Sequence, residues 1–177
     1  MSRFKYGGVI PAGAAAFAAA PRSALTTFRV ESRQEVGLKS TVRTRNFTID
    51  VDEPPTLGGT DLAPSPVEYA LAALATCQEI TYRLHADHLG IALDGVAVTL
   101  EGDIDLRGFF GTDEPIRPGF LAIRGTVTLD SQASVAELQR LRDHVDAHCP
   151  VLDLLSNPTP LHLELLTPTA TAAGAAA

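Results

Sequence analysis

The chain has two cysteines, Cys77 and Cys149, and a pair of thiols can carry redox chemistry. A thiolate that attacks a peroxide becomes a sulfenic acid, which a second thiol converts to a disulfide. The two residues lack the CxxC spacing of thioredoxin or zinc sites, and they are too few for a disulfide scaffold. A disulfide needs Cα atoms within about 7 Å, and the spacing of the two cysteines in the sequence does not show whether the fold brings them that close. From the residues alone, buried apolar thiols, a structural disulfide and a redox pair all stay open.

The histidines are the other side chains that could do chemistry. His85 and His88 have the i, i+3 spacing of one helix face, and His144 and His148 have i, i+4 spacing beside Cys149. Neither pair has a third ligand that the sequence can place, and histidine is common near helix C-termini for its charge. We therefore favour helix-end histidines and predict no metal and no cofactor, with His148 kept as a weak candidate for tuning the Cys149 thiol.

Composition limits the class of protein. A chain of 177 residues with 45% hydrophobic content is typical of one α+β domain with a sizeable core. The net charge of −7 offers no basic surface for nucleic acid, and no run approaches the roughly 18 apolar residues of a membrane helix. The N-terminal segment only faintly resembles a secretory signal, because glycines and Pro11 interrupt it. We expect a cytoplasmic protein that binds neither nucleic acid nor membrane.

The two ends differ in composition from the middle. Residues 1–24 are rich in Ala and Gly and predict a flexible N-terminal extension, and residues 167–177 predict a disordered tail. Residues 25–166 form the predicted domain. Apolar and polar residues alternate along 25–51, which predicts two or three strands, and the prolines and glycines of 52–64 predict a loop.

A long helix should carry Cys77. Ser65-Pro66-Val67-Glu68 is a capping box with proline at the first helical position, so a helix is predicted from Val67 through His85. The residues before Cys77 are apolar almost all the way round the helix. This pattern predicts a helix that is buried in a core.

The second half of the chain predicts a hairpin, a helix and a strand. Residues 96–100 and 120–129 alternate as two paired strands, with Gly125 marking a bulge or a close backbone approach. A second capping box, Ser134 to Glu137, starts a helix that Pro150 blocks, so that Cys149 lies where the helix ends. Residues 160–166 alternate as a final strand, and the predicted order is ββ-α-ββ-α-β.

Several of these motifs together resemble the OsmC/Ohr family of organic hydroperoxide reductases, in particular its OsmC-like branch. The motifs are Gly58-Gly59-Thr60-Asp61-Leu62-Ala63-Pro64-Ser65-Pro66-Val67-Glu68, then Cys77, His148-Cys149-Pro150-Val151 and Asn157-Pro158, with Leu106-Arg107-Gly108-Phe109 and Arg117-Pro118-Gly119-Phe120 between them. The resemblance covers about residues 45 to 166. It implies an α+β fold in which two chains intertwine as a homodimer, with antiparallel sheets around a buried central cysteine helix and active sites between the chains.

By that resemblance, Cys77 matches the thiol that attacks the peroxide and Cys149 the resolving thiol. Because burial raises the pKa of a thiol, the attacking cysteine needs a nearby cation, which in the family is an arginine oriented by a glutamate. Arg45 is our first choice and Arg43 the second, since the alternation puts both on the face of Phe47, and Arg33 in a turn is a third candidate.

The glutamate is displaced from the family pattern. Counted from Pro66 to Cys77, the position of the orienting glutamate holds Val67, and Glu68 comes one residue later. One residue rotates a helical side chain by about 100°. The sequence therefore leaves open whether Glu68 orients an arginine or only caps the helix.

These features predict thiol-dependent reduction of organic hydroperoxides to alcohols through a Cys77 sulfenic acid and a Cys77–Cys149 disulfide. The implied partners are a second copy of the chain, an organic hydroperoxide and a dithiol reductant such as a lipoylated protein. The alternative is a non-enzymatic OsmC-like module that binds a small molecule and whose cysteines are structural.

Overall fold

The computed structural model describes residues 4–167. The helices are α1 (Val9–Ala19), α2 (Pro66–Leu89), α3 (Leu106–Phe110), α4 (Val135–Asp146) and α5 (Pro150–Ser156), with short 3-10 helices at Pro21–Ala24 and Pro55–Leu57. The strands are β1 (Glu31–Gln34), β2 (Ser40–Thr44), β3 (Phe47–Val51), β4 (Gly95–Asp103) and β5 (Ala122–Asp130). The fold is therefore α+β, as the sequence predicts.

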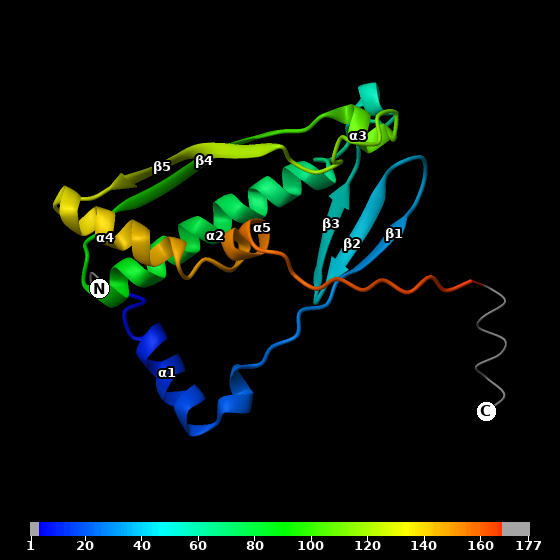
Figure 1. Ribbon diagram of the computed structural model, residues 1–177. Coiled ribbons are helices and arrows are strands. Elements are labelled where there is room, and N and C mark those ends of the chain that lie inside the picture. The colour runs from blue at the N-terminus through cyan, green and yellow to red at the C-terminus, as the bar shows by residue number, and fades with distance from the viewer. Residues whose placement is uncertain (1–3, 168–177) are drawn as a thin grey trace, which may run out of the picture.

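Two separate antiparallel sheets lie along the long helix α2. The strands β1-β2-β3 form one sheet near the start of α2, and the long β4-β5 hairpin runs beside the rest of it (Figure 1). The helices α4 and α5 pack against α2 away from that hairpin. The hairpin predicted from the alternating pattern is present, and so is the close approach at Gly125, where a Cβ would lie 2.0 Å from the backbone oxygen of Thr99.

Both predicted capping boxes start helices. At α2, the Ser65 amide and hydroxyl donate to Glu68 Oε2 at 2.7 and 2.8 Å, and the Glu68 amide donates to Ser65 Oγ. At α4, Ser134 and Glu137 repeat the arrangement. Helix α2 ends at Gly90, whose φ of 70° is the left-handed conformation that glycine adopts without strain. The capping box and Gly90 thus set where the helix that carries Cys77 starts and ends.

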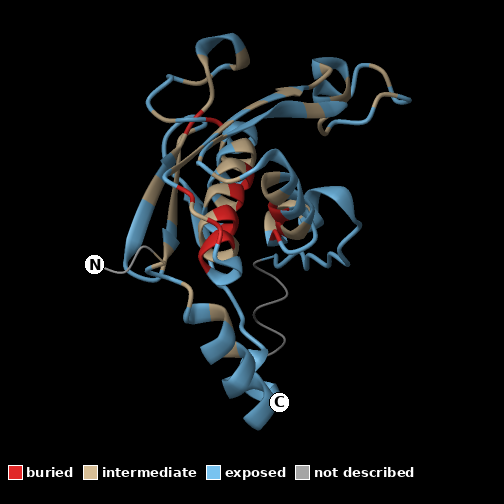
Figure 2. Cartoon of the chain, turned by 90° about the vertical axis from the view of Figure 1, so that its left-hand side faces the viewer, coloured by how far each residue is buried: buried red, intermediate tan, exposed pale blue. Residues whose placement is uncertain are grey.

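The core lies where the second half of α2 meets α4 (Figure 2). Its buried side chains are Tyr82, Ala86, Ile91, Leu93, Leu141 and Val145. Within the described residues 4–167, one face of α2 is covered, whereas Ala72, Ala73, Thr76 and Ile80 are exposed. The expectation of a helix buried all round is therefore not met by the described part of this one chain.

An aspartate that the sequence analysis did not single out organises the loop before α2. Asp52 is 1% exposed, and its Oδ2 accepts hydrogen bonds from the Thr60 hydroxyl at 2.6 Å and from the amides of Thr60 and Leu62. These bonds, with the Thr60 hydroxyl foremost, lower the pKa of Asp52 to about 2. Gly59 is required here, because a Cβ would lie 1.8 Å from the Glu53 backbone oxygen.

Two terminal segments differ from the sequence predictions. Residues 160–166 were predicted as a strand but form none, and Leu161, Leu163 and Leu165 are each more than four-fifths exposed. A strand needs a neighbour to pair with, and the segment runs away from the body of this chain (Figure 1). At the other end, α1 forms within the segment predicted as a flexible extension, because its alanines favour helix and Pro11 falls in the first turn, where proline is tolerated. Within the predicted tail, residues 168–177 lie outside the described part of the chain.

Candidate redox site

The two cysteines lie side by side. Cys77 is in the middle of α2, and Cys149 is the residue that precedes α5, after the short turn that follows α4. Their sulfur atoms are 3.4 Å apart, and the Cys149 thiol donates to Cys77 Sγ. Both are free thiols. The packing of α4 and α5 on α2 therefore brings together two residues that the sequence separates widely.

The two thiols have different surroundings. Cys77 is partly exposed, whereas Cys149 is only 1% exposed. Burial raises the pKa of the Cys149 thiol, and the adjacent Cys77 raises it further, against backbone hydrogen bonds at the start of α5 that lower it. Because the thiolate is the nucleophile, the accessible Cys77 is the better placed of the two to attack a peroxide from solvent.

The arginines predicted for this site lie elsewhere in the described chain. Arg45 was predicted on a strand, but it is in the two-residue turn between β2 and β3, with φ of 53°. It is exposed, and its guanidinium lies 5.1 Å from the centre of the Phe47 ring. No arginine of residues 4–167 donates a hydrogen bond to either sulfur, and the thiol pair is joined by the hydrogen bond from Cys149 to Cys77.

The position of Arg43 also differs from the prediction. It was placed on the face of Phe47, but it pairs with Thr48, while Thr44 pairs with Phe47. The turn at Arg45 interrupts the alternation, so the odd-numbered residues of β2 share a face with the even-numbered residues of β3. Arg43 and Arg33 are both exposed.

Glu68 is engaged as a helix cap. Its carboxylate accepts two hydrogen bonds from Ser65, and the bond from the backbone amide is the main cause of the lowered pKa of Glu68. These hydrogen bonds explain Glu68 as a helix cap, and the capping role does not require that Glu68 orient an arginine.

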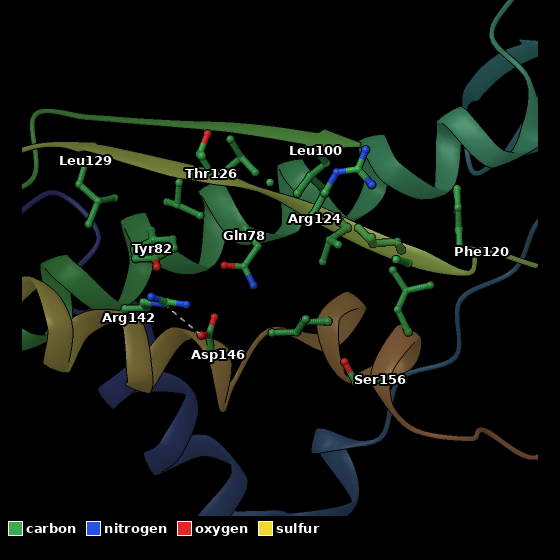
Figure 3. A pocket seen from close by; sticks show the side chains of 18 of the residues that line it. Gln78, Tyr82, Leu100, Phe120, Arg124, Thr126, Leu129, Arg142, Asp146 and Ser156 are labelled. Atoms are coloured by element: carbon green, nitrogen blue, oxygen red, sulfur yellow. Dashed lines mark ion pairs between the residues drawn. The ribbon is translucent and has the colours of Figure 1, made fainter. Parts of the chain in front are cut away.

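A large groove lies beneath β5 but does not include the thiols. It has a volume of about 1120 Å³ and lies between the β4-β5 hairpin and the helices α4 and α5. Gln78 and Tyr82 of α2 reach into it, with Arg142 and Asp146 of α4 opposite (Figure 3). Gln78 is 6% exposed and its Oε1 has no hydrogen-bond partner. Neither Cys77 nor Cys149 lines this groove.

Comparison with known proteins identifies the family. The sequence model of the OsmC protein family, described as OsmC-like protein, matches residues 59–164, which is more than half of the chain. The chain belongs to the OsmC-like family. The matched region contains both cysteines, the capping box of α2, and Thr60 and Leu62, whose amides donate to Asp52. No curated protein matched the sequence.

Solved structures of OsmC-like proteins share the fold. An OsmC-like protein from Mycoplasma pneumoniae is 19% identical with a TM-score of 0.65, covering 75% of this chain and 89% of its own. An organic hydroperoxide resistance protein OsmC from Legionella pneumophila is 24% identical with a TM-score of 0.58, covering 74% and 90%. An organic hydroperoxide resistance protein from Elizabethkingia anophelis is 19% identical with a TM-score of 0.55, covering 73% and 87%. At these identities the similarity establishes the fold.

None of the described helices is both long and apolar enough to span a bilayer.

Proposed function

We propose that this OsmC-like protein reduces organic hydroperoxides with Cys77 as the attacking thiol and Cys149 as the resolving thiol. The observation that carries the proposal is the 3.4 Å separation of the two free sulfurs, one partly exposed and one buried. Membership of the OsmC-like family supports a peroxide-related redox role, and similar folds are described as organic hydroperoxide resistance proteins.

The proposed reaction has two steps in the protein. The Cys77 thiolate attacks the terminal oxygen of the hydroperoxide, the O–O bond breaks, and the alkoxide takes up a proton and leaves as an alcohol. The Cys149 thiolate then attacks the sulfur of the Cys77 sulfenic acid, so that an S–S bond forms, the S–O bond breaks, and the departing hydroxide takes up a proton to become water. A dithiol reductant such as a lipoylated protein reduces the disulfide and completes the cycle.

The proposed assembly is a homodimer. Large apolar side chains are exposed in this chain, among them Phe28 at 91%, Ile80 at 61% and Leu163 at 83%. Exposed apolar surface of this extent is typical of an interface. A second chain would cover the open face of α2 and supply a strand neighbour for residues 160–166.

Turnover tests the proposed function. With dithiothreitol as reductant, we expect the protein to consume cumene hydroperoxide continuously, at a rate proportional to protein concentration. Hydrogen peroxide is the comparison substrate, and we expect slower consumption because it has no apolar group to bind. If the protein consumed neither peroxide faster than the reductant alone does, the proposal would be refuted.

Replacing Arg45 tests how Cys77 is activated. If the arginine reaches Cys77 in the assembled protein, Arg45→Ala should move the pH dependence of Cys77 alkylation to higher pH by about one unit and slow peroxide reduction by about tenfold, which corresponds to about 1.4 kcal/mol. Rates of iodoacetamide labelling over a pH series measure the effect, in a Cys149→Ser background so that a single thiol reports.

Arg43→Ala and Arg33→Ala are the matched controls, because both are exposed arginines of the same sheet region. An alkylation profile that moves with Arg43→Ala or Arg33→Ala and not with Arg45→Ala would assign the role to that arginine instead.

A non-enzymatic binding module is the second candidate function. The observation that favours it is the groove of about 1120 Å³, in which Gln78 offers an unpartnered buried oxygen and neither cysteine takes part. A protein of this kind would bind an apolar molecule with a hydrogen-bond donor and would show no peroxide turnover. The turnover assay described above distinguishes the two functions.

A further inference from the structure

Three imidazoles meet where α4 packs on α2. His85 extends from α2, His144 from the last turn of α4, and His148 from the turn that leads to Cys149. The ring centres of His85 are 4.6 Å from His144 and 5.2 Å from His148, and those of His144 and His148 are 4.3 Å apart. The sequence pairs His144 with His148, and the packing of α4 on α2 adds His85 as the third ring.

The rings keep nitrogen lone pairs available for a ligand. His148 Nδ1 is 2.6 Å from the His144 backbone oxygen, and since a carbonyl only accepts, Nδ1 carries the proton. This leaves Nε2 of a neutral His148 unprotonated, in the arrangement that metal-binding histidines commonly have. His85 Nδ1 is buried and has no hydrogen-bond partner. An unpaired buried nitrogen is costly, and a ligand would satisfy it.

We propose that His85, His144 and His148 bind one divalent transition-metal ion of the zinc class. Three imidazoles on a tetrahedral zinc, with Zn–N bonds of about 2.1 Å, have ring centres about 5 Å apart, close to the separations seen here. The rings are tilted toward one another, and as the side chains stand no group of three His, Cys, Asp or Glu residues within 4–167 is arranged to hold a metal ion. Binding therefore requires rotation of rings whose backbones are already in place.

The ligands come from both sides of the α2–α4 contact, and His148 directly precedes Cys149. A bound ion would therefore link the helix that carries Cys77 to the segment that carries Cys149. Imidazole-only ligation leaves both thiols out of the site, so the proposal stands whether or not the protein reduces peroxides.

Metal titration of the full chain, prepared without an oligohistidine tag, tests the site. The background is the Cys77→Ser/Cys149→Ser double variant, which prevents thiol ligation. Zn²⁺ is titrated in competition with a chromophoric chelator, and Co²⁺ is titrated while its ligand-field absorption is followed. We expect one ion per chain and the intense visible bands of a tetrahedral cobalt site.

Single substitutions assign the ligands. His85→Gln, His144→Gln and His148→Gln should each weaken Zn²⁺ binding by about tenfold or more, because each removes one ligand. His88→Gln and His162→Gln are the matched controls, since both are exposed histidines outside the cluster, and they should leave the affinity unchanged. Circular dichroism checks that each variant keeps its helices.

A second measurement uses no substitution in the cluster. The imidazole resonances of His85, His144 and His148 should shift on addition of Zn²⁺ to the double variant, while those of His162 stay in place. Absence of stoichiometric Zn²⁺ binding at micromolar concentration, equal losses in the control variants, or unmoved resonances of the three rings would each overturn the proposal.

Discussion

Replacing Cys77 with serine should reduce the rate of organic hydroperoxide consumption by roughly 10³-fold or more, to the rate of reductant alone. The reason is that a serine hydroxyl is not ionised at neutral pH and forms no sulfenic acid. The remaining thiol, Cys149, is 1% exposed and has a pKa raised by burial, so it is a poor substitute nucleophile. Steady-state peroxide consumption with dithiothreitol measures the loss.

The Cys149→Ser variant is the matched control for the order of the two thiols. It keeps the attacking thiol, so we expect one equivalent of peroxide to be consumed rapidly and a sulfenic acid to persist on Cys77, where a dimedone label detects it by mass. If Cys77→Ser formed the sulfenic acid on Cys149 instead, the assigned roles would be reversed. A Cys149→Ser protein that forms no sulfenic acid would contradict the role of Cys77 as the attacking thiol.

The largest loss of stability should come from Leu141→Ala. Leu141 of α4 is 0% exposed and belongs to the cluster that joins α4 to α2. Removing its side chain leaves a cavity and should lower the free energy of unfolding by about 2–5 kcal/mol. Urea denaturation followed by circular dichroism measures the change, provided that the transition is two-state.

Val135→Ala on the same helix is the control for that experiment. Val135 is 85% exposed, so its truncation should change the free energy of unfolding by no more than about 0.5 kcal/mol. A loss for Val135→Ala equal to that for Leu141→Ala would show that burial within this chain does not set the stability of α4. It would also indicate that the exposed face of α4 is covered in the assembled protein.

Features decided by local chemistry could be predicted from the sequence. Each capping box needs only four consecutive residues, and both start helices at the predicted serines, Ser65 and Ser134. The β4-β5 hairpin follows from alternation over many residues, and Gly125 marks the close approach that its pattern suggested. These elements carry or support the two cysteines.

Features decided by partners distant in the chain were harder to predict. The alternation near β2 and β3 continues through the turn at Arg45, so counting along it put Arg43 on the wrong face. The alternating leucines of residues 160–166 predict a strand, but strand formation depends on a neighbour, and the described part of this chain supplies none. The helix α1 lies within the segment predicted as a flexible extension, and its alanine-rich composition is compatible with a helix.

The candidate site was predictable only in part. Motifs at Cys77 and at His148-Cys149-Pro150 indicated a thiol pair, and the structure brings the two sulfurs together. The sequence could not place His85 beside His144 and His148, because that contact depends on how α4 packs on α2. The buried Asp52 gave no sequence signal beyond its position at the start of a loop.

The most direct test of the proposed chemistry is to map the products of one oxidation. Reduced wild-type protein is treated with one equivalent of tert-butyl hydroperoxide, its free thiols are blocked with iodoacetamide, and an unreduced digest is analysed by mass spectrometry. The account predicts that peptides containing Cys77 and Cys149 are joined by a disulfide and that one equivalent of tert-butanol is released. Recovery of both cysteines as alkylated free thiols, with the peroxide unconsumed, would contradict it.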